Sequence, residues 1–357
     1  MSQQFHGLKV SSITAETAEA VVVSFEVPVA IAAKFEFVAG QYLTLRASID
    51  GVDLRRSYSI CSPVGLQPLS VGIRQVPSGV FSSWVNNDLR VGDVVQVFEP
   101  QGRFSLPDEP VSKRHVVAIA GGAGITPILS IASSLLAAEP GSSFALIYAN
   151  RTQASTMFKV ALDDLKDRYV TRFSVHNVLS RERSDSPLCD GRLDSERLSL
   201  FLRTVTPADR IDHAFVCGPG DFNDLVEGAL TSAGLCDAQI HIERFGVPTG
   251  TVVARTAADV DTTATVHLVV IRDGRRHDLG PVSRALSVLE AASAAGLDVP
   301  YSCRAGVCTT CRAKLVDGVV HMERNFALDR NDVAAGFVLT CQSHPRSASV
   351  TVSFDER

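Results

Sequence analysis

Four cysteines near the end of the chain constrain its fold more than any other feature. The segment PYSCRAGVCTTC places Cys303, Cys308 and Cys311 in a C-x4-C-x2-C loop, and Cys341 follows further along the chain. One tight loop can direct three thiolates inward while a fourth, from a distant strand, closes the site. In a long chain, clustered cysteines bind metal more often than they form disulfides. The other cysteines are expected to be ordinary thiols, with Cys217 as the exception: Cys61, Cys189, Cys217 and Cys236.

The spacing of the clustered cysteines is that of a plant-type [2Fe-2S] site. Small loop residues, Gly306 among them, let backbone N–H groups approach the cluster sulfurs and stabilise the reduced, more negative state. Zinc is the alternative, but structural zinc usually takes two separated pairs of cysteines or histidines, which a three-plus-one distribution fits poorly. We therefore predict that these four cysteines bind a [2Fe-2S] cluster.

Length and charge restrict the class of protein. The 357 residues suffice for two or three domains, and 45% hydrophobic with 20% charged residues is typical of soluble globular chains. No apolar run reaches the roughly 18 residues that a membrane span needs. A net charge of −5 argues against nucleic acid as a partner. The opening MSQQFHGLKV lacks a basic patch followed by an apolar stretch, so we expect no signal peptide and a cytoplasmic protein.

Residues 1–110 alternate short apolar runs with turn residues. The runs AVVVSFEVP, GQYLTLRAS, RSYSI, LSVGIRQV and DVVQVF have the spacing of antiparallel strands, with Gly, Pro, Asp or Asn between them. We predict that this domain is an antiparallel β-barrel.

The pattern changes over residues 111–246. Strands that are apolar throughout, such as HVVAIA, SFALIYAN and HAFVCGP, alternate with amphipathic helical segments. This pattern predicts an α/β domain with a doubly wound parallel sheet, because helices cover both faces of such a sheet. Residues 247–262 show no clear period and are interpreted as a linker. Residues 263–357 contain a predicted hairpin, a helix closed by Gly296 and two late strands, which indicate a small α+β domain.

Two segments of the predicted barrel suit a flavin nucleotide. In RRSYSICS, Arg56 can pair bidentately with a pyrophosphate, and the aromatic face of Tyr58 suits a planar ring. In GVFSSW, residues 79–82 open a short helix whose N–H groups would face the same pyrophosphate. This second phosphate contact favours FAD over FMN. Taken alone, Arg56 and Tyr58 would more simply form a surface pair.

Further segments, in the α/β domain, suit a nicotinamide dinucleotide. HVVAIAGGAGITP is a glycine-rich turn between a strand and a helix, although Pro127 stands where the third glycine of the dinucleotide motif would be. We predict that Thr126 is the N-cap and Pro127 the first residue of that helix. YANR, SRE and CGPG each follow a further predicted strand.

The order of these segments resembles that of the ferredoxin–NADP reductase family. The resemblance implies that Tyr58 packs on the isoalloxazine ring of FAD and that Cys217 lies beside the nicotinamide. It also implies that Ser180 and Arg181 hold the 2′-phosphate of NADPH, with NADH as the alternative coenzyme if Arg181 is only one of several exposed arginines. The residues implied in catalysis are Ser59, Cys217 and Glu243. The residues implied in cofactor binding are Arg56, Ser57, Tyr58, Ser59, Ile73, Gly79, Val80, Ser82, Gly122, Gly124, Thr126, Asn150, Arg151, Ser180, Arg181, Cys217, Gly218, Pro219 and Phe245.

The C-terminal segment resembles a plant-type ferredoxin, which implies a β-grasp fold. From Thr263 to Arg357 there are 11 Lys and Arg against 10 Asp and Glu, whereas free ferredoxins are usually strongly acidic. A carrier that is tethered to its reductase does not need electrostatic steering, because the linker supplies effective concentration.

Together these segments predict a NAD(P)H-dependent oxidoreductase that transfers electrons. A hydride carries two electrons and a [2Fe-2S] cluster accepts one, so a flavin must stand between NADPH and the cluster. The chain shows no haem motif and no paired E-x-x-H motif, so the final acceptor is expected to be another protein.

A narrower resemblance concerns that acceptor. FEFVAGQYLTL, DLRRSYSICS, VPSGVFSSW, YANRT, LKDRY, LSRE, GRLD and HIERF occur in the order seen in the reductase subunits of phenylacetyl-CoA epoxidases. This implies a di-iron oxygenase as the partner, in phenylacetate degradation. Two alternatives stay open: the reductase of a Rieske-type ring or steroid hydroxylase, and a redox-sensing module.

Overall fold

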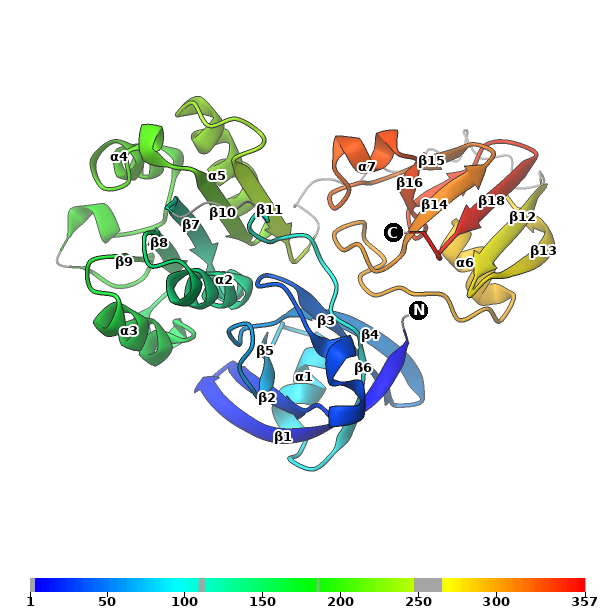
Figure 1. Ribbon diagram of the computed structural model, residues 1–357, viewed down its shortest axis with the longest axis horizontal. Coiled ribbons are helices and arrows are strands. Elements are labelled where there is room, and N and C mark those ends of the chain that lie inside the picture. Colours follow the sequence, from blue (N-terminus) through cyan, green and yellow to red (C-terminus); the bar gives the residue numbers. More distant parts are fainter. Residues whose placement is uncertain (1–3, 109–112, 185, 247–264, 357) are drawn as a thin grey trace. The chain divides into compact units, whose positions relative to one another are not determined.

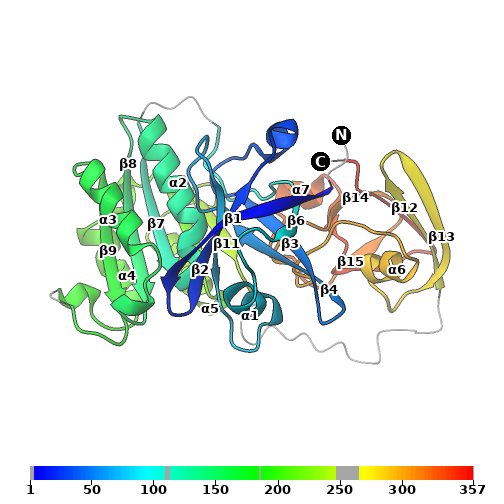
Figure 2. The same ribbon diagram turned by 90° about the horizontal axis from the view of Figure 1, so that it is seen from below.

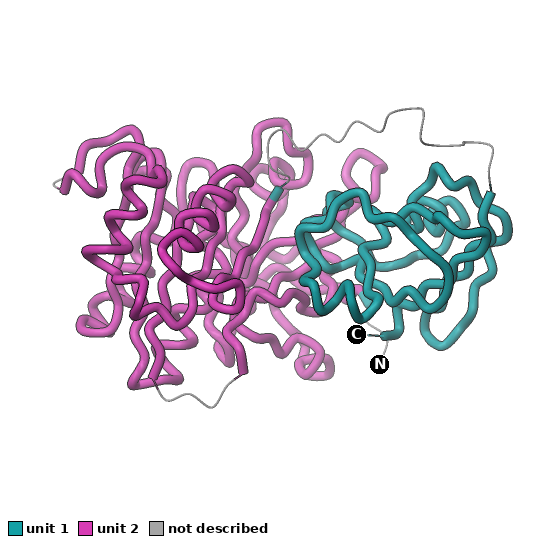
Figure 3. The backbone as a smooth tube through the Cα atoms, turned by 90° about the horizontal axis from the view of Figure 1, so that it is seen from above, with its two compact units in different colours: residues 1–4, 246–357 teal, residues 5–245 magenta. Residues whose placement is uncertain are grey.

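The computed structural model describes residues 4–108, 113–184, 186–246 and 265–356. The chain divides into two compact units, Phe5–Phe245 and Gly246–Arg357 with the first four residues (Figure 3). The predicted linker at 247–262 lies outside the described residues. Among the described residues, no helix has the length and apolar character needed to cross a membrane.

The larger unit begins with an antiparallel sheet in the order β4-β3-β6-β1-β2-β5. A bridge between Ile60 and Val71 joins its two edges, so the sheet closes into the predicted barrel. Leu8, Phe25 and Leu45 are among the apolar side chains that fill it. Its elements are β1 (Phe5–Thr17), β2 (Ala20–Glu26), the 3-10 helix η1 (Val29–Phe35), β3 (Tyr42–Ile49), β4 (Val52–Ser59), β5 (Leu69–Arg74), α1 (Val80–Asn87) and β6 (Val94–Phe98).

The rest of this unit contains a parallel sheet in the order β11-β10-β7-β8-β9. Figure 1 shows α2 and α3 on one face and α4 and α5 on the other, and Figure 2 is viewed from the side of α2 and α3. The strands are β7 (His115–Gly121), β8 (Ser143–Asn150), β9 (Phe173–Leu179), β10 (His213–Gly218) and β11 (Ile240–Arg244). The helices are α2 (Ile125–Ala138), α3 (Lys159–Arg168), α4 (Ser195–Thr204) and α5 (Gly220–Ser232), with short 3-10 turns at Gly122–Gly124, Gln153–Ser155, Pro187–Cys189 and Ala208–Arg210.

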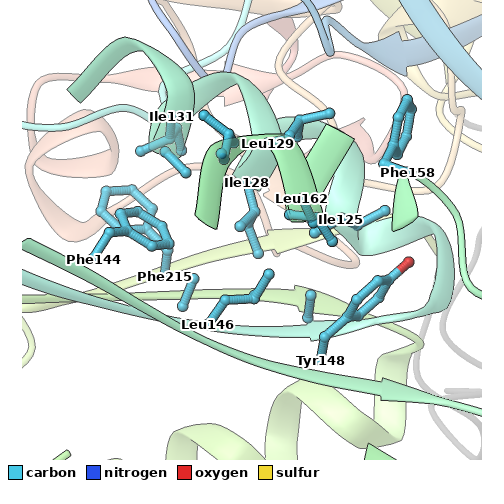
Figure 4. Close-up of a cluster of buried hydrophobic side chains, with 14 of the residues drawn as sticks. Ile125, Ile128, Leu129, Ile131, Phe144, Leu146, Tyr148, Phe158, Leu162 and Phe215 are labelled. Carbon is cyan, nitrogen blue, oxygen red and sulfur yellow. The ribbon is translucent and has the colours of Figure 1, made fainter. Parts of the chain in front are cut away.

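Both faces of this sheet are buried. Along β7, Val116 and Ala118 pack under α2 and α3, whereas Val117 and Ile119 pack under α4 and α5. In the first of these clusters, Ile128 of α2 lies over the strand residues Leu146 and Phe215 (Figure 4). Strands covered on both faces are apolar throughout, which is why the sequence pattern predicted a doubly wound sheet and why that prediction is confirmed.

The start of α2 differs from the prediction. The helix begins at Ile125 with Gly124 as its N-cap, so Thr126 and Pro127 are its second and third residues. Thr126 is buried, and its hydroxyl donates to the carbonyl of Ala123 at 3.0 Å. The prediction that Thr126 is the N-cap is wrong because the 3-10 turn Gly122–Gly124 runs directly into the helix.

The smaller unit contains a mixed sheet in the order β13-β12-β18-β14-β16 and a two-stranded sheet, β15-β17. Its helix α6 begins in a capping box between Ser287 and Glu290 and buries Val288 and Leu289 against the sheet. This arrangement agrees with the predicted α+β domain. The elements are β12 (Thr265–Arg272), β13 (Arg275–Ser283), α6 (Val288–Ala294), β14 (Arg312–Asp317), β15 (Val320–Met322), α7 (Arg330–Ala334), β16 (Phe337–Leu339), β17 (Ser343–Pro345) and β18 (Ser349–Ser353).

Candidate functional site

The strand order of the parallel sheet reverses between β7 and β10. β7 and β10 are neighbours, and their chains continue in opposite directions along the sheet, which is the position where such sheets bind nucleotides. The turn after β7 approaches β10 closely, since a Cβ on Gly124 would lie 2.0 Å from the carbonyl oxygen of Cys217. Gly122 has φ +53° and Gly218 follows Cys217. The predicted residues of these two turns are therefore side by side.

The predicted catalytic residues also come together. The Ser59 hydroxyl, at the end of β4, donates to Glu243 Oε2 at 2.9 Å. Glu243 lies on β11 opposite Cys217 of β10 in the parallel register. Burial raises the pKa of Glu243 to about 8, and the Ser59 hydrogen bond opposes this effect. A carboxyl with that pKa is mostly protonated at neutral pH, so it can donate a proton next to Ser59.

Cys217 is fully buried. Burial first, and the charge of Glu243 second, raise the pKa of its thiol well above the ordinary value. The Cys217 side chain is thus a neutral thiol rather than a nucleophilic thiolate. At this position Cys217 therefore provides a small, apolar side chain.

On the barrel, Arg56 and Tyr58 are two residues apart on β4 and therefore share one face of the strand. Arg56 is exposed, and its Nη1 donates to the Arg55 carbonyl at 2.8 Å. The Tyr58 ring lies 6.0 Å from that of Phe81 in α1. Ser57 points to the other face and shares a hydrogen bond of 3.2 Å with Thr44.

The residues predicted at the start of α1 lie in a loop that the Ser82 side chain holds in place by hydrogen bonds. Gly79 is the N-cap of the helix, and Val80, its first residue, is exposed. The Ser82 hydroxyl accepts from the Val76 N–H at 3.0 Å and donates to the Gly79 carbonyl at 3.2 Å. Ile73 is different, because its side chain is fully buried in the barrel core. Only its backbone is available to a cofactor.

The third predicted set gathers at the ends of β8 and β9. The Ser180 N–H donates to the Asn150 carbonyl at 3.0 Å, and the Arg181 N–H donates to the Arg151 carbonyl at 2.8 Å. Ser180, Arg151 and Arg181 are exposed. Asn150 is buried. Its side-chain amide interacts with the Tyr148 hydroxyl but forms no hydrogen bond of standard geometry within the described residues. Pro219 is the N-cap of α5, and Phe245 lies exposed just after β11.

One arginine at this site was missed. Arg74 ends β5, and a Cβ on Gly122 would lie 3.2 Å from its Nη1. A guanidinium therefore reaches the glycine-rich turn from the barrel. The sequence offered only a weak indication, a single Arg at the end of an apolar strand.

The smaller unit holds the four clustered cysteines. The Cys308 thiol donates to Cys303 Sγ at 3.1 Å, and the thiols of Cys308 and Cys341 together lower the pKa of Cys303. Cys341 likewise interacts with Cys311, so all four sulfurs converge. The Ala305 N–H donates to Cys303 Sγ at 3.4 Å and Gln342 Nε2 donates to Cys341 Sγ at 3.6 Å.

The loop around these sulfurs requires its glycine. Gly306 has φ +76°, and a Cβ there would lie 3.0 Å from the Arg324 carbonyl oxygen. The donor set is four thiols with backbone and amide N–H groups directed at them, and no disulfide forms among them. This donor set fits a [2Fe-2S] cluster. The glycine-rich turn fits a nucleotide phosphate, because a Cβ on Gly122 would meet only the Arg74 guanidinium, at 3.2 Å.

Three family models match the chain. They are the oxidoreductase FAD-binding domain over residues 7–106, the oxidoreductase NAD-binding domain over residues 118–227 and the 2Fe-2S iron-sulfur cluster binding domain over residues 273–346. The FAD, NAD(P)H and [2Fe-2S] predictions are thereby confirmed.

Relatives extend the similarity over the whole chain. The chain is 40% identical to a subunit of 1,2-phenylacetyl-CoA epoxidase from Escherichia coli (strain K12), covering 99% of this chain and 98% of that one. It is 32% identical to the ferredoxin reductase component of 3-ketosteroid-9-alpha-monooxygenase from Rhodococcus rhodochrous, covering 97% and 96%. The solved structure of phthalate dioxygenase reductase superposes with a TM-score of 0.59 at 25% identity, covering 98% of both chains.

These matches agree with the three sites built above from the residues. The chain therefore belongs to the family of oxygenase reductase components that combine an FAD-binding domain, an NAD-binding domain and a [2Fe-2S] domain in one polypeptide.

Proposed function

We propose that this protein takes electrons from NADPH and delivers them to the di-iron oxygenase component of a phenylacetyl-CoA epoxidase, in phenylacetate degradation. The observation that carries the choice of partner is the 40% identity over 99% of the chain to the Escherichia coli epoxidase protein, against 32–34% for the steroid monooxygenase reductases. The convergence of Ser59, Glu243 and Cys217 supports turnover rather than sensing, because a sensor does not need a hydride-transfer site.

When bound, FAD accepts a hydride and the [2Fe-2S] cluster carries single electrons. The residues of this chain supply the surroundings for that chemistry. Arg56 and the N–H groups at the start of α1 would bind and orient the FAD pyrophosphate, and Tyr58 would hold its ring. Glu243, protonated at neutral pH, holds a proton that Ser59 can relay. Cys217 excludes water beside the nicotinamide, since it is buried and neutral.

NADPH is the proposed coenzyme because exposed arginines stand at the ends of both β8 and β9. The Arg181 N–H donates to the Arg151 carbonyl, so the two residues are neighbours in space. Their two guanidinium groups can therefore bind the same phosphate. The compartment proposed is the cytoplasm, where NADPH is supplied and where thiols such as Cys61 and Cys236 stay reduced. The domain limits proposed are 1–110, 111–246 and 263–357.

A second candidate acceptor is a steroid or ring hydroxylase. It is favoured by the 32% identity to the 3-ketosteroid-9-alpha-monooxygenase reductase over nearly the whole of both chains.

The test is reconstitution of substrate turnover with purified oxygenase components. We expect phenylacetyl-CoA to be epoxidised when NADPH, this protein and the epoxidase's oxygenase are combined, with a higher kcat/KM for NADPH than for NADH. A steroid hydroxylase oxygenase assayed in parallel is the matched comparison. Turnover only with the steroid oxygenase would replace the proposed partner by the second candidate, and a cluster that stays oxidised under excess NADPH would refute both.

A further inference from the structure

A single carboxylate connects two arginines of the nucleotide site. Glu19 lies in the turn between β1 and β2, and its Oε2 accepts from Arg74 Nη2 at 2.9 Å and from Arg151 Nη2 at 2.8 Å. The Glu19 carbonyl also accepts from the Gln75 N–H at 2.7 Å, which fixes the turn beside the end of β5. Together, Arg74 and Arg151 keep the pKa of Glu19 below its ordinary value, so the carboxylate is charged at neutral pH.

Both arginines occupy positions that a dinucleotide needs. Arg74 reaches the turn after β7, where a Cβ on Gly122 would lie 3.2 Å from its Nη1. Arg151 follows β8, and its carbonyl accepts from the Arg181 N–H at 2.8 Å. Glu19 thus bridges a cation at the glycine-rich turn and a cation at the edge where β8 and β9 end.

A carboxylate and a phosphate are oxyanions that use the same guanidinium N–H groups. While Glu19 holds Arg151, that side chain is not free to turn both N–H donors toward a phosphate, and a phosphate that approaches meets a negative charge. The Glu19 side chain is 53% exposed and that of Arg151 is 46% exposed. Such exposed ion pairs are weak, so a dianionic phosphate can displace the carboxylate.

We propose that Glu19 is a coenzyme-specificity residue, which competes with the 2′-phosphate of NADPH for Arg151 and so limits the preference for NADPH over NADH. The proposal rests on the proposed assignment of the β8–β9 edge to the 2′-phosphate. It places a specificity determinant on the barrel rather than on the nucleotide-binding domain. The β1–β2 turn acts by setting how much of the positive charge at this edge is available to the coenzyme.

The experiment compares Glu19→Gln with Glu26→Gln in the full-length holoenzyme. Glu26 ends β2 of the same hairpin, is exposed and loses the same charge, so it controls for net charge and for hairpin stability. The probes are 2′,5′-ADP and 5′-AMP, which differ in the 2′-phosphate alone, with affinities measured by isothermal titration calorimetry. FAD and iron content of each variant establish that it is folded and loaded.

We expect Glu19→Gln to lower the Kd for 2′,5′-ADP by about threefold, the factor that one exposed ion pair of under about 1 kcal/mol supports. The Kd for 5′-AMP should change much less, and Glu26→Gln should change neither. Adding Arg151→Ala to Glu19→Gln should remove the gain, because the competition is for that guanidinium.

Three results would overturn the proposal. They are an unchanged or weaker affinity of Glu19→Gln for 2′,5′-ADP, an equal gain for 5′-AMP, and an equal gain in Glu26→Gln. The coenzyme preference of the unmodified protein is a separate measurement, taken from kcat/KM for NADPH and NADH. A preference for NADH would refute the proposed coenzyme, while the effect of Glu19 would still be decided by the two ligand affinities.

Discussion

At the scale of single residues, the central arrangement is a serine from the barrel strand β4 brought together with a cysteine and a glutamate from the neighbouring strands β10 and β11. Ser59 and Cys217 stand in short motifs at the ends of predicted strands, and Glu243 stands in the segment HIERF. The resemblance to the reductase family implied the roles of all three. Arg74 and Glu19 were not named. A charged residue in a hairpin turn or at a strand end has the same sequence pattern whether it contacts water or another charged group. Only the folded structure shows that Glu19 accepts from Arg74 within the barrel and from Arg151 of the α/β domain.

The raised pKa of Glu243 makes stability depend on pH in a defined direction. Burial raises the pKa from 4.5 to about 8 in the folded chain, so between these values the folded state binds more protons than the unfolded state. This part of the stability is fully present below about pH 4.5 and is lost as the pH rises through about 8. The glutamine of the Glu243→Gln variant cannot ionise, so the stability of this variant should not fall over that pH range.

We therefore expect the melting temperature of Glu243→Gln, relative to the unmodified protein, to rise by at least about 2 °C between pH 5 and pH 9. Differential scanning fluorimetry at both pH values measures this. Glu26→Gln, at an exposed position, should show a constant difference. If the difference in melting temperature between Glu243→Gln and the unmodified protein is the same at pH 5 and pH 9, the carboxyl ionises normally in the folded protein.

At the scale of secondary-structure elements, periodicity identified most of the fold. The apolar strands β7, β8 and β10 and the helices α2, α3 and α5 were predicted, because a strand covered on both faces or a helix covered on one face has a clear pattern. Strand β1 and the short strand β11 were not identified. Every residue of β11 is half-buried, so this strand has neither the continuous apolar run of a central strand nor a strict alternation.

The turn between β7 and α2 is the element with the least tolerance for a side chain. A Cβ on Gly124 would lie 2.0 Å from the Cys217 carbonyl oxygen and 2.4 Å from its carbon, and backbone atoms of a central strand cannot move aside. We expect Gly124→Ala to displace the turn, to lower stability by about 2 kcal/mol or more and to weaken NADPH binding.

The matched control is Gly228→Ala in α5, where a Cβ would meet nothing within 4 Å. It should be neutral or stabilising by up to about 1 kcal/mol, since alanine is the better helix former. Urea denaturation and coenzyme titration of both variants give the comparison. Equal behaviour of the two alanine variants would show that the turn can adjust without cost.

At the scale of the whole molecule, three predicted domains form two compact units. The barrel and the α/β domain share hydrogen bonds such as that from the Phe158 N–H to Glu16 at 2.8 Å, in addition to the pairing of Ser59 with Glu243. A sequence shows where the pattern of elements changes, but it does not show how many contacts cross that boundary. The flavin and nicotinamide sites thus lie within one unit, and the four cysteines lie in the other.

This division predicts that the two activities can be separated. Cys308→Ser removes one cluster ligand from the smaller unit and leaves the larger unit unchanged. We expect NADPH-driven reduction of cytochrome c to fall to background while reduction of ferricyanide continues. Visible absorption monitors loss of the cluster and retention of FAD, and Cys236→Ser, at an exposed thiol outside the cluster, is the control. Parallel loss of both activities would contradict the proposed order of electron transfer.

The strand order of the parallel sheet has a consequence for how this protein can evolve. Because β7 stands between β10 and β8, Cys217 and Glu243 belong to strands on one side of β7, whereas Arg151 and Arg181 follow strands on its other side. If the proposed site assignments hold, mutations that change the coenzyme preference can accumulate at the ends of β8 and β9 without disturbing Cys217 and Glu243. Organisms with different supplies of NADPH and NADH can thus change the coenzyme preference of this reductase by a few surface substitutions, while its partner and its reaction stay the same.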